Sequence, residues 1–398
     1  MMFRQPRHIR DGEMMARMLE NIRIIDLTTI VFGPYATETL ADLGADVIKI
    51  EAPSGDMFRN SGASVKTGGM GACHMTLNRG KKSLTLDLKT ERDKEKLREL
   101  LRTADVFIHN VRKRAIDRLG FGYDAVKAIN KDIIYTHCVG FGSGGRYRDL
   151  PAYDDVIQAA TGTATLLSRV DGQARPRYLP SLIADKVAGL HGTYSVLAAL
   201  VHKLRTGEGQ FVEVPMFESF AHFMLQEHLF GATFKPQAYQ MGYTRQLDPE
   251  RQPFPTADGH ISIVLYTDAI TEKLLVLFAD DRLTNDVRFA TKPDRMKNAT
   301  ALYAEIAHRT PAKTTAEWTQ LFEVAGIPSM PMHDLEDVLD DPHLDDVNFF
   351  AIAQHPTEGR YVSMKAPVSF SARPCTQLDP APLLGEHDSH LEALLKRS

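Results

Sequence analysis

The sequence has few cysteines and no clear excess of charge of either sign. Its 398 residues include 3 cysteines, and the formal net charge is −4 at pH 7. Cys73, Cys138 and Cys375 are odd in number and form no C-x-x-C pair, which argues against structural zinc and favours a reducing compartment. We therefore expect a cytoplasmic protein whose cysteines are buried thiols. The charge balance provides no basic surface of the kind that binds nucleic acid.

Long apolar runs and several catalytic signatures are also missing. No stretch approaches the roughly 20 apolar residues that cross a bilayer, so we expect no membrane-spanning segment. The G-x-S-x-G turn of serine hydrolases and the H-E-x-x-H zinc motif do not occur. His387 and His390 lie near the C-terminus without an acidic partner in such a motif, and we interpret them as surface residues. We expect no metal site.

What the sequence does contain is an alternation of short apolar strands and helices. Residues 22–27 read as a buried strand, residues 35–43 as a helix and residues 45–51 as a second strand, which together predict a βαβ unit. Such units form parallel sheets whose ligands bind at the carboxyl ends of the strands, here at residues 28–34 and after Glu51. Further strands of this α/β fold are predicted at residues 82–88, 106–110, 133–139 and 211–214.

The chain is long enough for a second, smaller domain. Residues 230–255 are rich in Gln, Tyr and Pro and are interpreted as a linker. A strand is predicted at residues 260–264, and residues 267–325 read as mostly helical. The second domain is therefore expected to be separate from the parallel sheet.

Asp185 lies where an apolar run meets a long predicted helix. At or beside the N-cap, its oxygens could accept hydrogen bonds from unpaired N–H groups, and the helix dipole would favour its ionised form. A carboxylate held in this way can be a nucleophile, but spacing alone favours the simpler role of a helix cap. The apolar residues that recur at helical spacing, and are expected to be buried, are Val187, Leu190, Tyr194, Leu197, Val201 and Leu204.

Residues 140–145 match the G-x-G-x-x-G pattern after a predicted strand. A dinucleotide-binding fingerprint opens a helix at once, whereas residues 146–151 intervene here. We therefore interpret this segment as a glycine turn.

Two charged clusters have two possible roles each. Arg112, Lys113, Arg114 and Arg118 follow the strand at residues 106–110, where they could bind a phosphate-rich ligand or simply form a solvated helix face. The Asp154-Asp155 pair could be two catalytic acids, or a helix cap beside an exposed charge.

Several segments, taken in order, resemble the class III CoA-transferases, the family of formyl-CoA and carnitine CoA-transferases that also includes the α-methylacyl-CoA racemases. Together they run from about Leu19 to the C-terminus. Each segment alone is modest, but the ordered set is specific. The segments are residues 33–36, 43–51, 78–89, 105–110, 118–120, 153–162, 203–214, 325–328, 341–342 and 384–387.

The resemblance implies a large Rossmann-like domain with a parallel sheet, built from both ends of the chain, and a smaller α+β domain. We expect an N-terminal extension at residues 1–18, a large CoA-binding domain at residues 19–229 and 345–398, and a linker with the small domain at residues 230–344. Two such chains are expected to interlock as linked rings, giving a bacterial-type cytoplasmic homodimer.

The resemblance also implies the chemistry and the residues that carry it. Asp185 corresponds to the nucleophile, which attacks a thioester to give a mixed anhydride and free CoA thiolate. The substrates would be an acyl-CoA and a small carboxylic acid, with no permanently bound cofactor. The positions that correspond to CoA contacts are Asn110, Arg112, Arg118, Val31 and Leu86.

Three departures from the family's patterns bear on specificity. Racemases carry a histidine immediately before the acid that aligns with Asp154, whereas this chain has Tyr153, which favours CoA transfer. Residues 240–251, where formyl-CoA transferases have a glycine-rich loop, contain only Gly242, and Val31 stands where those enzymes have glutamine. Both changes argue against oxalate and formate as substrates. An α-methylacyl-CoA racemase or epimerase and a non-catalytic CoA-binding homologue are the alternatives.

Overall fold

The computed structural model describes residues 17–372 and 378–395, so residues 1–16 of the expected extension and Cys375 lie outside it. The described residues form two compact units. One takes those within 1–161, 178–223 and 345–398, and the other takes those within 162–177 and 224–344. Residues 162–177 and 224–229 thus fall in the second unit, whereas the sequence placed them in the large domain. The expected domain boundaries otherwise stay a prediction.

The first unit is built on a six-stranded sheet with the order β3-β2-β1-β4-β5-β6, in which every pairing is parallel. This is the strand order of the Rossmann fold, so the predicted α/β class is confirmed. The strand order reverses between β1 and β4, and a ligand crevice is expected where the loops after these strands diverge. The strands are β1 (Arg23–Leu27), β2 (Asp46–Glu51), β3 (Lys81–Thr85), β4 (Val106–His109), β5 (Ile134–Val139) and β6 (Phe211–Pro215).

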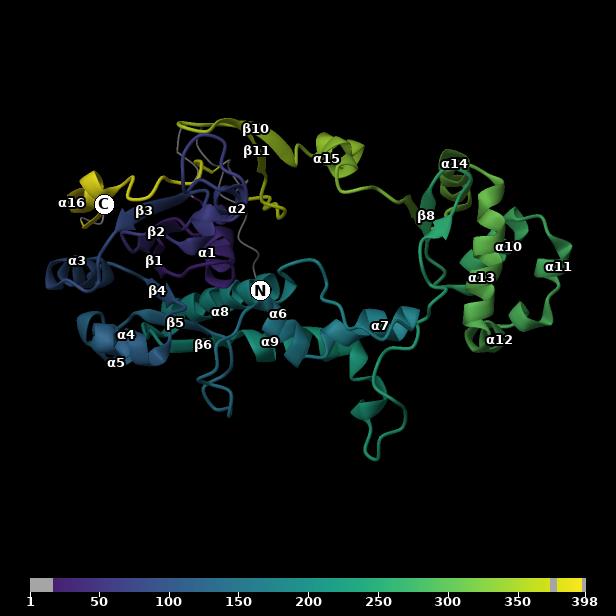
Figure 1. Cartoon of the computed structure of the whole chain (residues 1–398), viewed down its shortest axis with the longest axis horizontal. Coiled ribbons are helices and arrows are strands. Elements are labelled where there is room, and N and C mark those ends of the chain that lie inside the picture. The colour runs from purple at the N-terminus through teal and green to yellow at the C-terminus, as the bar shows by residue number, and fades with distance from the viewer. Residues whose placement is uncertain (1–16, 373–377, 396–398) are drawn as a thin grey trace, which may run out of the picture. The chain divides into compact units, whose positions relative to one another are not determined.

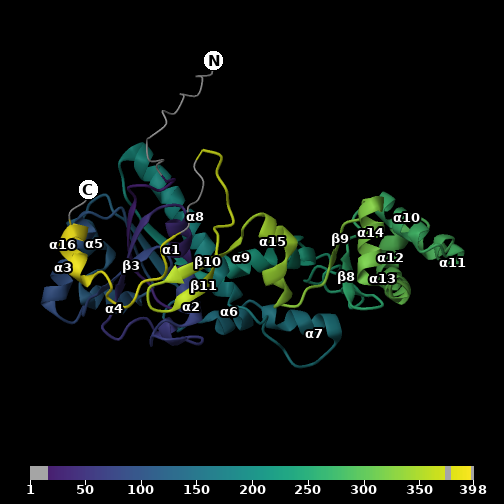
Figure 2. The same cartoon turned by 90° about the horizontal axis from the view of Figure 1, so that it is seen from above.

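Helices cover both faces of this sheet (Figures 1 and 2). One face packs against α3 (Glu91–Arg102), α4 (Lys113–Leu119), α5 (Tyr123–Ile129) and α16 (Leu391–Leu395) around a continuous apolar core. The apolar residues of α3 fall at positions 97, 100 and 101 and are fully buried, as the helical period requires. The other face carries α1 (Phe32–Asp42) and α8 (Ile183–Thr206).

The long helix α8 packs against α1 through its small residues. A Cβ atom at Gly189 would lie 2.8 Å from Tyr35 Cδ1 and 3.0 Å from the carbonyl oxygen of Phe32. The Thr193 hydroxyl donates to the carbonyl of Ala36 at 3.3 Å. Close approach of the two helices therefore depends on residues that have little or no side chain.

The predicted burial of the large apolar residues of α8 is mostly wrong. Val187 is buried and Leu197 is half-buried, but the side chains of the other four residues are exposed, because the small residues take the contact with α1. The exposed fractions in the single chain are 49% for Leu190, 55% for Tyr194, 54% for Val201 and 79% for Leu204.

Replacing Gly189 with alanine is expected to destabilise the protein, although alanine in a helix is intrinsically more favourable than glycine by about 1 kcal/mol. The added methyl group would force α1 and α8 apart, and we expect the free energy of unfolding to fall by about 1–2 kcal/mol. Gly192→Ala is the matched control, since its Cβ would lie 3.3 Å from the Ala36 Cβ, a milder contact than that at Gly189, which a shift of a few tenths of an ångström would relieve. Urea denaturation of both variants provides the measurement, and equal stability of the two would contradict this packing account.

The remaining elements of the first unit are arranged around the sheet. The edge strand β3 is covered by the C-terminal segment: Thr85 N–H donates to Asp388 Oδ1 at 2.7 Å, and Ser83 N–H donates to His387 Nδ1 at 3.3 Å. His387 is thus half-buried against the edge of β3 and is not the surface residue expected, whereas His390 is exposed as predicted.

The first unit contains further short elements. These are α2 (Ala72–Leu77), α6 (Asp154–Ala160), β10 (Phe350–His355) and β11 (Gly359–Met364), while α9 (Met216–His228) and α15 (Pro342–Asp346) span the unit boundaries.

The second unit has its own core around Leu274, Ile306, Trp318 and Phe322. A small antiparallel sheet, β7-β8-β9, and a set of helices surround that core, as the strand at residues 260–264 and the helical pattern after it predicted. The strands are β7 (Phe254–Pro255), β8 (His260–Ile263) and β9 (Ser329–Pro331), and the helices are α10 (Asp268–Leu277), α11 (Asp281–Thr284), α12 (Lys292–Lys297), α13 (Ala299–Arg309) and α14 (Thr315–Ala325). The short helix α7 (Leu166–Asp171) belongs to the same unit but not to this core.

The cysteines fit the sequence expectation only in part. Cys138 is buried in β5, whereas Cys73 in α2 is exposed. In the described residues no helix is long and apolar enough to cross a membrane.

Candidate active site

Asp185 lies in the first turn of α8, close to where the sequence placed it, but it does not cap the helix. The helix begins at Ile183, and Leu182 occupies the N-cap position. The backbone N–H of Asp185 donates to Asp154 Oδ1 at 3.1 Å, so the cap is a carboxylate from α6. The capping role expected for Asp185 therefore belongs to Asp154, which leaves the Asp185 carboxyl group available for chemistry.

Asp154 is held in place by a second contact. Its Oδ2 accepts a hydrogen bond of 2.6 Å from Gln158 Nε2, one turn along α6. The Gln158 Oε1 atom accepts in turn from the Leu179 N–H at 2.9 Å, which ties α6 to the segment that leads into α8. Asp155 is exposed. Of the two roles considered for the acidic pair, a cap beside an exposed charge is correct, but the capped helix is α8.

The Asp185 carboxyl group is 7% exposed, and its pKa is raised to about 7. Burial is the main cause, and the nearby negative charge of Asp154 adds to it. A hydrogen bond from the Phe32 backbone acts in the opposite direction. The helix dipole was expected to favour the ionised form of Asp185, but burial of the carboxylate raises the pKa more than the favourable N–H contact lowers it.

The partner in that hydrogen bond, Phe32, is the first residue of α1. The first N–H groups of a helix have no partner inside the helix, and Pro34 in the same turn has no N–H at all. Since α1 starts directly after the β1 loop, these N–H groups lie at the crevice predicted from the strand order. They can stabilise negative charge that develops on an atom bound beside Asp185.

Asn110 joins the two loops that flank this crevice. It follows β4, and its Oδ1 accepts from the Thr29 N–H at 3.1 Å while its Nδ2 donates to the Thr29 carbonyl at 2.9 Å. Val31 caps α1 and is 2% exposed. The structure therefore brings Asn110 and Val31 to the same loop as Phe32, the contact of Asp185.

The basic cluster after β4 is only partly neutralised. Lys113 pairs with Asp117 at 2.7 Å and Arg114 with Asp149 at 3.6 Å. Arg112, the N-cap residue of α4, and Arg118 are exposed, and neither forms a salt bridge within the described residues. Both guanidinium groups are thus accessible to an anionic ligand.

Leu86 lies elsewhere. It is 3% exposed and belongs to the apolar core that packs against α3, α4 and α5. Its side chain is therefore covered in this structure, and its assignment to CoA binding stays a prediction.

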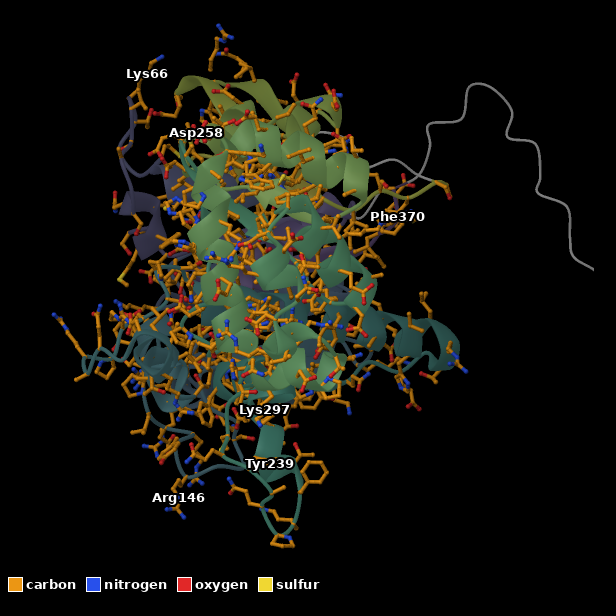
Figure 3. All side chains as sticks on the ribbon, turned by 90° about the vertical axis from the view of Figure 1, so that its right-hand side faces the viewer. Lys66, Arg146, Tyr239, Asp258, Lys297 and Phe370 are labelled. Atoms are coloured by element: carbon orange, nitrogen blue, oxygen red, sulfur yellow. The ribbon has the colours of Figure 1, made fainter. Side chains whose placement is uncertain are left out.

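The glycine loop after β5 is not arranged as a phosphate cradle. Gly142 N–H donates to both Glu218 oxygens, at 3.0 and 3.2 Å, and Ser143 N–H donates to Glu213 Oε1 at 2.9 Å. Carboxylates therefore occupy the N–H groups that a phosphate would need. The Arg146 side chain projects away from the loop (Figure 3), and no helix begins until α6. This agrees with the interpretation as a glycine turn.

Buried polar residues that the sequence analysis did not single out also meet near the crevice. Lys49 and Asp56 form an ion pair of 3.2 Å, with side chains 0% and 1% exposed. Lys49 sits in β2 within a pattern that alternates like a half-exposed strand, and Asp56 sits in a polar loop, so no local signal separates them from solvated charges. Across residues 17–372 and 378–395, no group of three or more His, Cys, Asp or Glu side chains is placed to hold a metal ion.

Comparison with known proteins supports the resemblance in the sequence. The family model CoA-transferase family III matches residues 19–388. The chain is 31% identical to succinyl-CoA:mesaconate CoA-transferase from Haloarcula marismortui, with 94% of this chain and 95% of that protein covered. It is also 31% identical to formyl-CoA:oxalate CoA-transferase from Streptomyces avermitilis, with 95% of each covered.

A solved structure shares the fold over nearly the whole chain. The crystal structure of Rv3272 from Mycobacterium tuberculosis matches with a TM-score of 0.81 and 30% identity, covering 94% of this chain and 99% of that one. The parallel sheet, its Rossmann strand order and the match over residues 19–388 lead to one conclusion. This chain belongs to CoA-transferase family III.

Proposed function

We propose that this class III CoA-transferase moves CoA from an acyl-CoA thioester to a free carboxylic acid through covalent intermediates on Asp185. The observation that carries the proposal is one buried carboxyl group, with a pKa of about 7, hydrogen-bonded to the start of α1. A carboxylate that is desolvated yet ionisable near neutral pH is a better nucleophile than one in water. It needs no serine, metal or separate base.

The first half of the reaction releases the donor acid. An Asp185 oxygen attacks the thioester carbonyl carbon, the C–S bond breaks, and CoA leaves as a thiolate from a mixed anhydride. The thiolate then attacks the Asp185 carbonyl carbon of the anhydride, so that the donor acid departs as a carboxylate and Asp185 carries CoA as a thioester. Atoms and charge balance without any additional reactant.

The second half runs the same chemistry with the acceptor acid. The acceptor carboxylate attacks the Asp185 thioester and expels the CoA thiolate, giving a second mixed anhydride. The thiolate attacks the acceptor side of this anhydride, which forms the new acyl-CoA and regenerates Asp185. Each step passes through an oxyanion, and the N–H groups at the start of α1 are suited to stabilise it.

The surroundings of Asp185 favour transfer over racemisation. Proton abstraction at the α-carbon needs a second base, and the residue at the racemase histidine position is Tyr153, which is 60% exposed. Asp154 is engaged by the Asp185 N–H and Gln158 Nε2. Incubation with a 2-methylacyl-CoA in deuterated water, without an acceptor acid, separates the reactions: α-deuteration would favour an epimerase, and its absence together with acceptor-dependent transfer supports the proposal. A non-catalytic CoA-binding homologue would bind CoA and show neither activity.

Arg112 and Arg118 are proposed to bind the phosphates of CoA. Replacing both with alanine is expected to raise the KM for the acyl-CoA by about 10- to 100-fold, since each guanidinium contributes a charge-assisted hydrogen bond of about 1.5–3 kcal/mol that exposure reduces. The kcat should change much less. Arg102→Ala is the matched control, because this exposed arginine ends α3 just before β4, whereas Arg112 and Arg118 follow the carboxyl end of that strand. An unchanged KM in the double variant would remove both residues from the CoA site.

Other features of the expected protein stay proposals. The substrates named for the relatives include succinyl-CoA, glutarate, mesaconate and oxalate, so small dicarboxylic acids are the first acceptors to screen. A pooled screen read by mass spectrometry identifies the pair that this enzyme uses. The interlocked homodimer is supported by the exposed apolar side chains of α8, and a cytoplasmic location stays a prediction.

A further inference from the structure

The loop between β1 and α1 contains a backbone conformation that its sequence does not favour. Ile30 has a φ of 72°, in the left-handed region. β-branched residues rarely adopt this conformation, because the side chain crowds the backbone and strains it. Surrounding structure must therefore hold Ile30 in place.

Asp56 provides that anchor from the neighbouring strand. The Ile30 N–H donates to both oxygens of Asp56, at 3.2 Å each. Asp56 is 2% exposed and lies in the loop after β2, the strand that pairs with β1. The same carboxylate accepts from the Phe58 N–H at 3.0 Å, which fixes its own loop.

Lys49, in β2, is the second residue that holds the β1 loop. Its ammonium group is fully buried, donates to the Thr28 carbonyl at 2.7 Å and pairs with Asp56 Oδ2 at 3.2 Å. The β1 loop is thus held at Thr28 by Lys49, at Ile30 by Asp56 and, from the opposite side of the crevice, at Thr29 by Asn110. Phe32, whose backbone meets Asp185, comes two residues after Ile30.

We propose that Asp56 is a positioning residue for CoA transfer, which holds Ile30 in its strained conformation so that the Phe32 N–H points at the carboxyl group of Asp185. This inference rests on the proposed role of Asp185. Capping the short turn at residues 57–60 would require only the contact to Phe58. The contacts to Ile30 and the buried Lys49 instead serve the loop that carries Phe32. Without them, the strained residue would relax and displace the start of α1.

The test replaces the ion pair as a unit. Asp56→Ala alone would leave the Lys49 ammonium buried and unpaired, so the principal variant is Asp56→Ala/Lys49→Met, which removes both charges. The first readout is hydrogen exchange of the backbone at residues 28–34, measured by mass spectrometry, where we expect exchange at least about tenfold faster. This readout needs no catalytic activity.

The second readout is the pH profile of the transfer reaction. A displaced Phe32 N–H should lower kcat by about 10- to 100-fold. The acidic limb of the profile, where activity is lost as the pH falls, should move to higher pH, since this hydrogen bond lowers the Asp185 pKa. Adding Ile30→Gly should restore part of the rate, because glycine adopts a positive φ without strain. The control is Asp46→Ala, which breaks ion pairs with Arg23 and Lys82 at the other end of β2.

The outcomes separate this inference from the proposed function. Unchanged exchange at residues 28–34, or a loss of rate that Asp46→Ala reproduces at equal stability, would overturn the role of Asp56. Faster exchange with an unaltered kcat and pH limb would do the same and leave the Asp185 mechanism standing. Faster exchange, a lower kcat, a shifted limb and rescue by Ile30→Gly together support it. Full activity of Asp185→Asn would instead reject the proposed function.

Discussion

Replacing Asp185 with asparagine is expected to lower the rate of CoA transfer by about 10⁴-fold or more, the range found when an essential nucleophile is removed. Asparagine is nearly the same size and accommodates the same backbone, but its amide oxygen cannot form a mixed anhydride by direct attack at a useful rate. Binding of CoA should change little, because the proposed phosphate contacts lie on Arg112 and Arg118. Steady-state kinetics and calorimetric CoA titration measure the two effects separately.

The same substitution is expected to stabilise the folded protein above neutral pH. The Asp185 pKa is raised from 3.8 to about 7 in the folded state, so the protonated acid is the form that folding favours. Its stabilising contribution is present below pH 3.8 and is lost as the pH rises through about 7. At pH 8 the wild-type protein buries a charge that the asparagine variant lacks, and the variant should be more stable by on the order of 1 kcal/mol. Equal or lower stability at pH 8, with equal stability at pH 4, would contradict the burial argument.

The second large effect concerns the dependence of activity on pH. Because only the ionised form of Asp185 attacks a thioester, kcat/KM should fall as the pH drops through about 7. Burial is the main cause of this high pKa and the charge of Asp154 is the next. Asp154→Asn removes that charge while its amide oxygen can still accept from the Asp185 N–H. The acidic limb should therefore move to lower pH by about 1 unit, and stay above the pKa of an exposed aspartate.

The matched control for this shift is Asp155→Asn, which removes the same charge from the next position of α6, where the side chain is exposed. Solvent screens an exposed charge, so kcat/KM of this variant should fall at the same pH as in the wild-type enzyme. A limb that is unmoved in Asp154→Asn, or moved equally in both variants, would show that Asp154 does not set the ionisation of the nucleophile.

The parallel sheet could be predicted from the sequence because its strands have strong local signals. Residues 23–27 and 106–109 are short segments rich in Ile, Leu, Val and Phe, too short for a helix, and each is followed by a segment that can return over the sheet. The positions of α1 and β2 follow for the same reason. A ligand site beside residues 28–34 then follows from the general rules of such folds, whereas the strand order comes from the structure alone.

The face that α8 buries could not be predicted from hydrophobicity. Gly189 and Gly192 carry no apolar side chain, yet they form the contact with α1, while Leu190 and Tyr194 lie outside it. A pattern of large apolar residues identifies the helix face whose burial would remove the most apolar surface from water. It does not identify the surface along which two helices approach most closely.

The raised pKa of Asp185 also could not be predicted from its neighbours in the sequence. Its helix position indicated a low pKa, but the groups that determine it come from elsewhere in the chain: Asp154 lies 31 residues away, and Phe32 starts a different helix. Asp56 and Lys49 were overlooked for a related reason. Charged residues in a loop and in an alternating strand are usually solvated, and only the folded structure shows that these two are buried against the β1 loop.

The central claim is that Asp185 becomes covalently linked during turnover. The most direct measurement is to incubate the enzyme with an acyl-CoA substrate, quench with hydroxylamine and analyse the peptide that spans residues 180–190 by mass spectrometry. Hydroxylamine converts an aspartyl thioester or the aspartyl side of an anhydride into a hydroxamate. The account predicts a hydroxamate on Asp185 that requires the acyl-CoA and is lost in Asp185→Asn. Active transfer of CoA with Asp185 unmodified would contradict it.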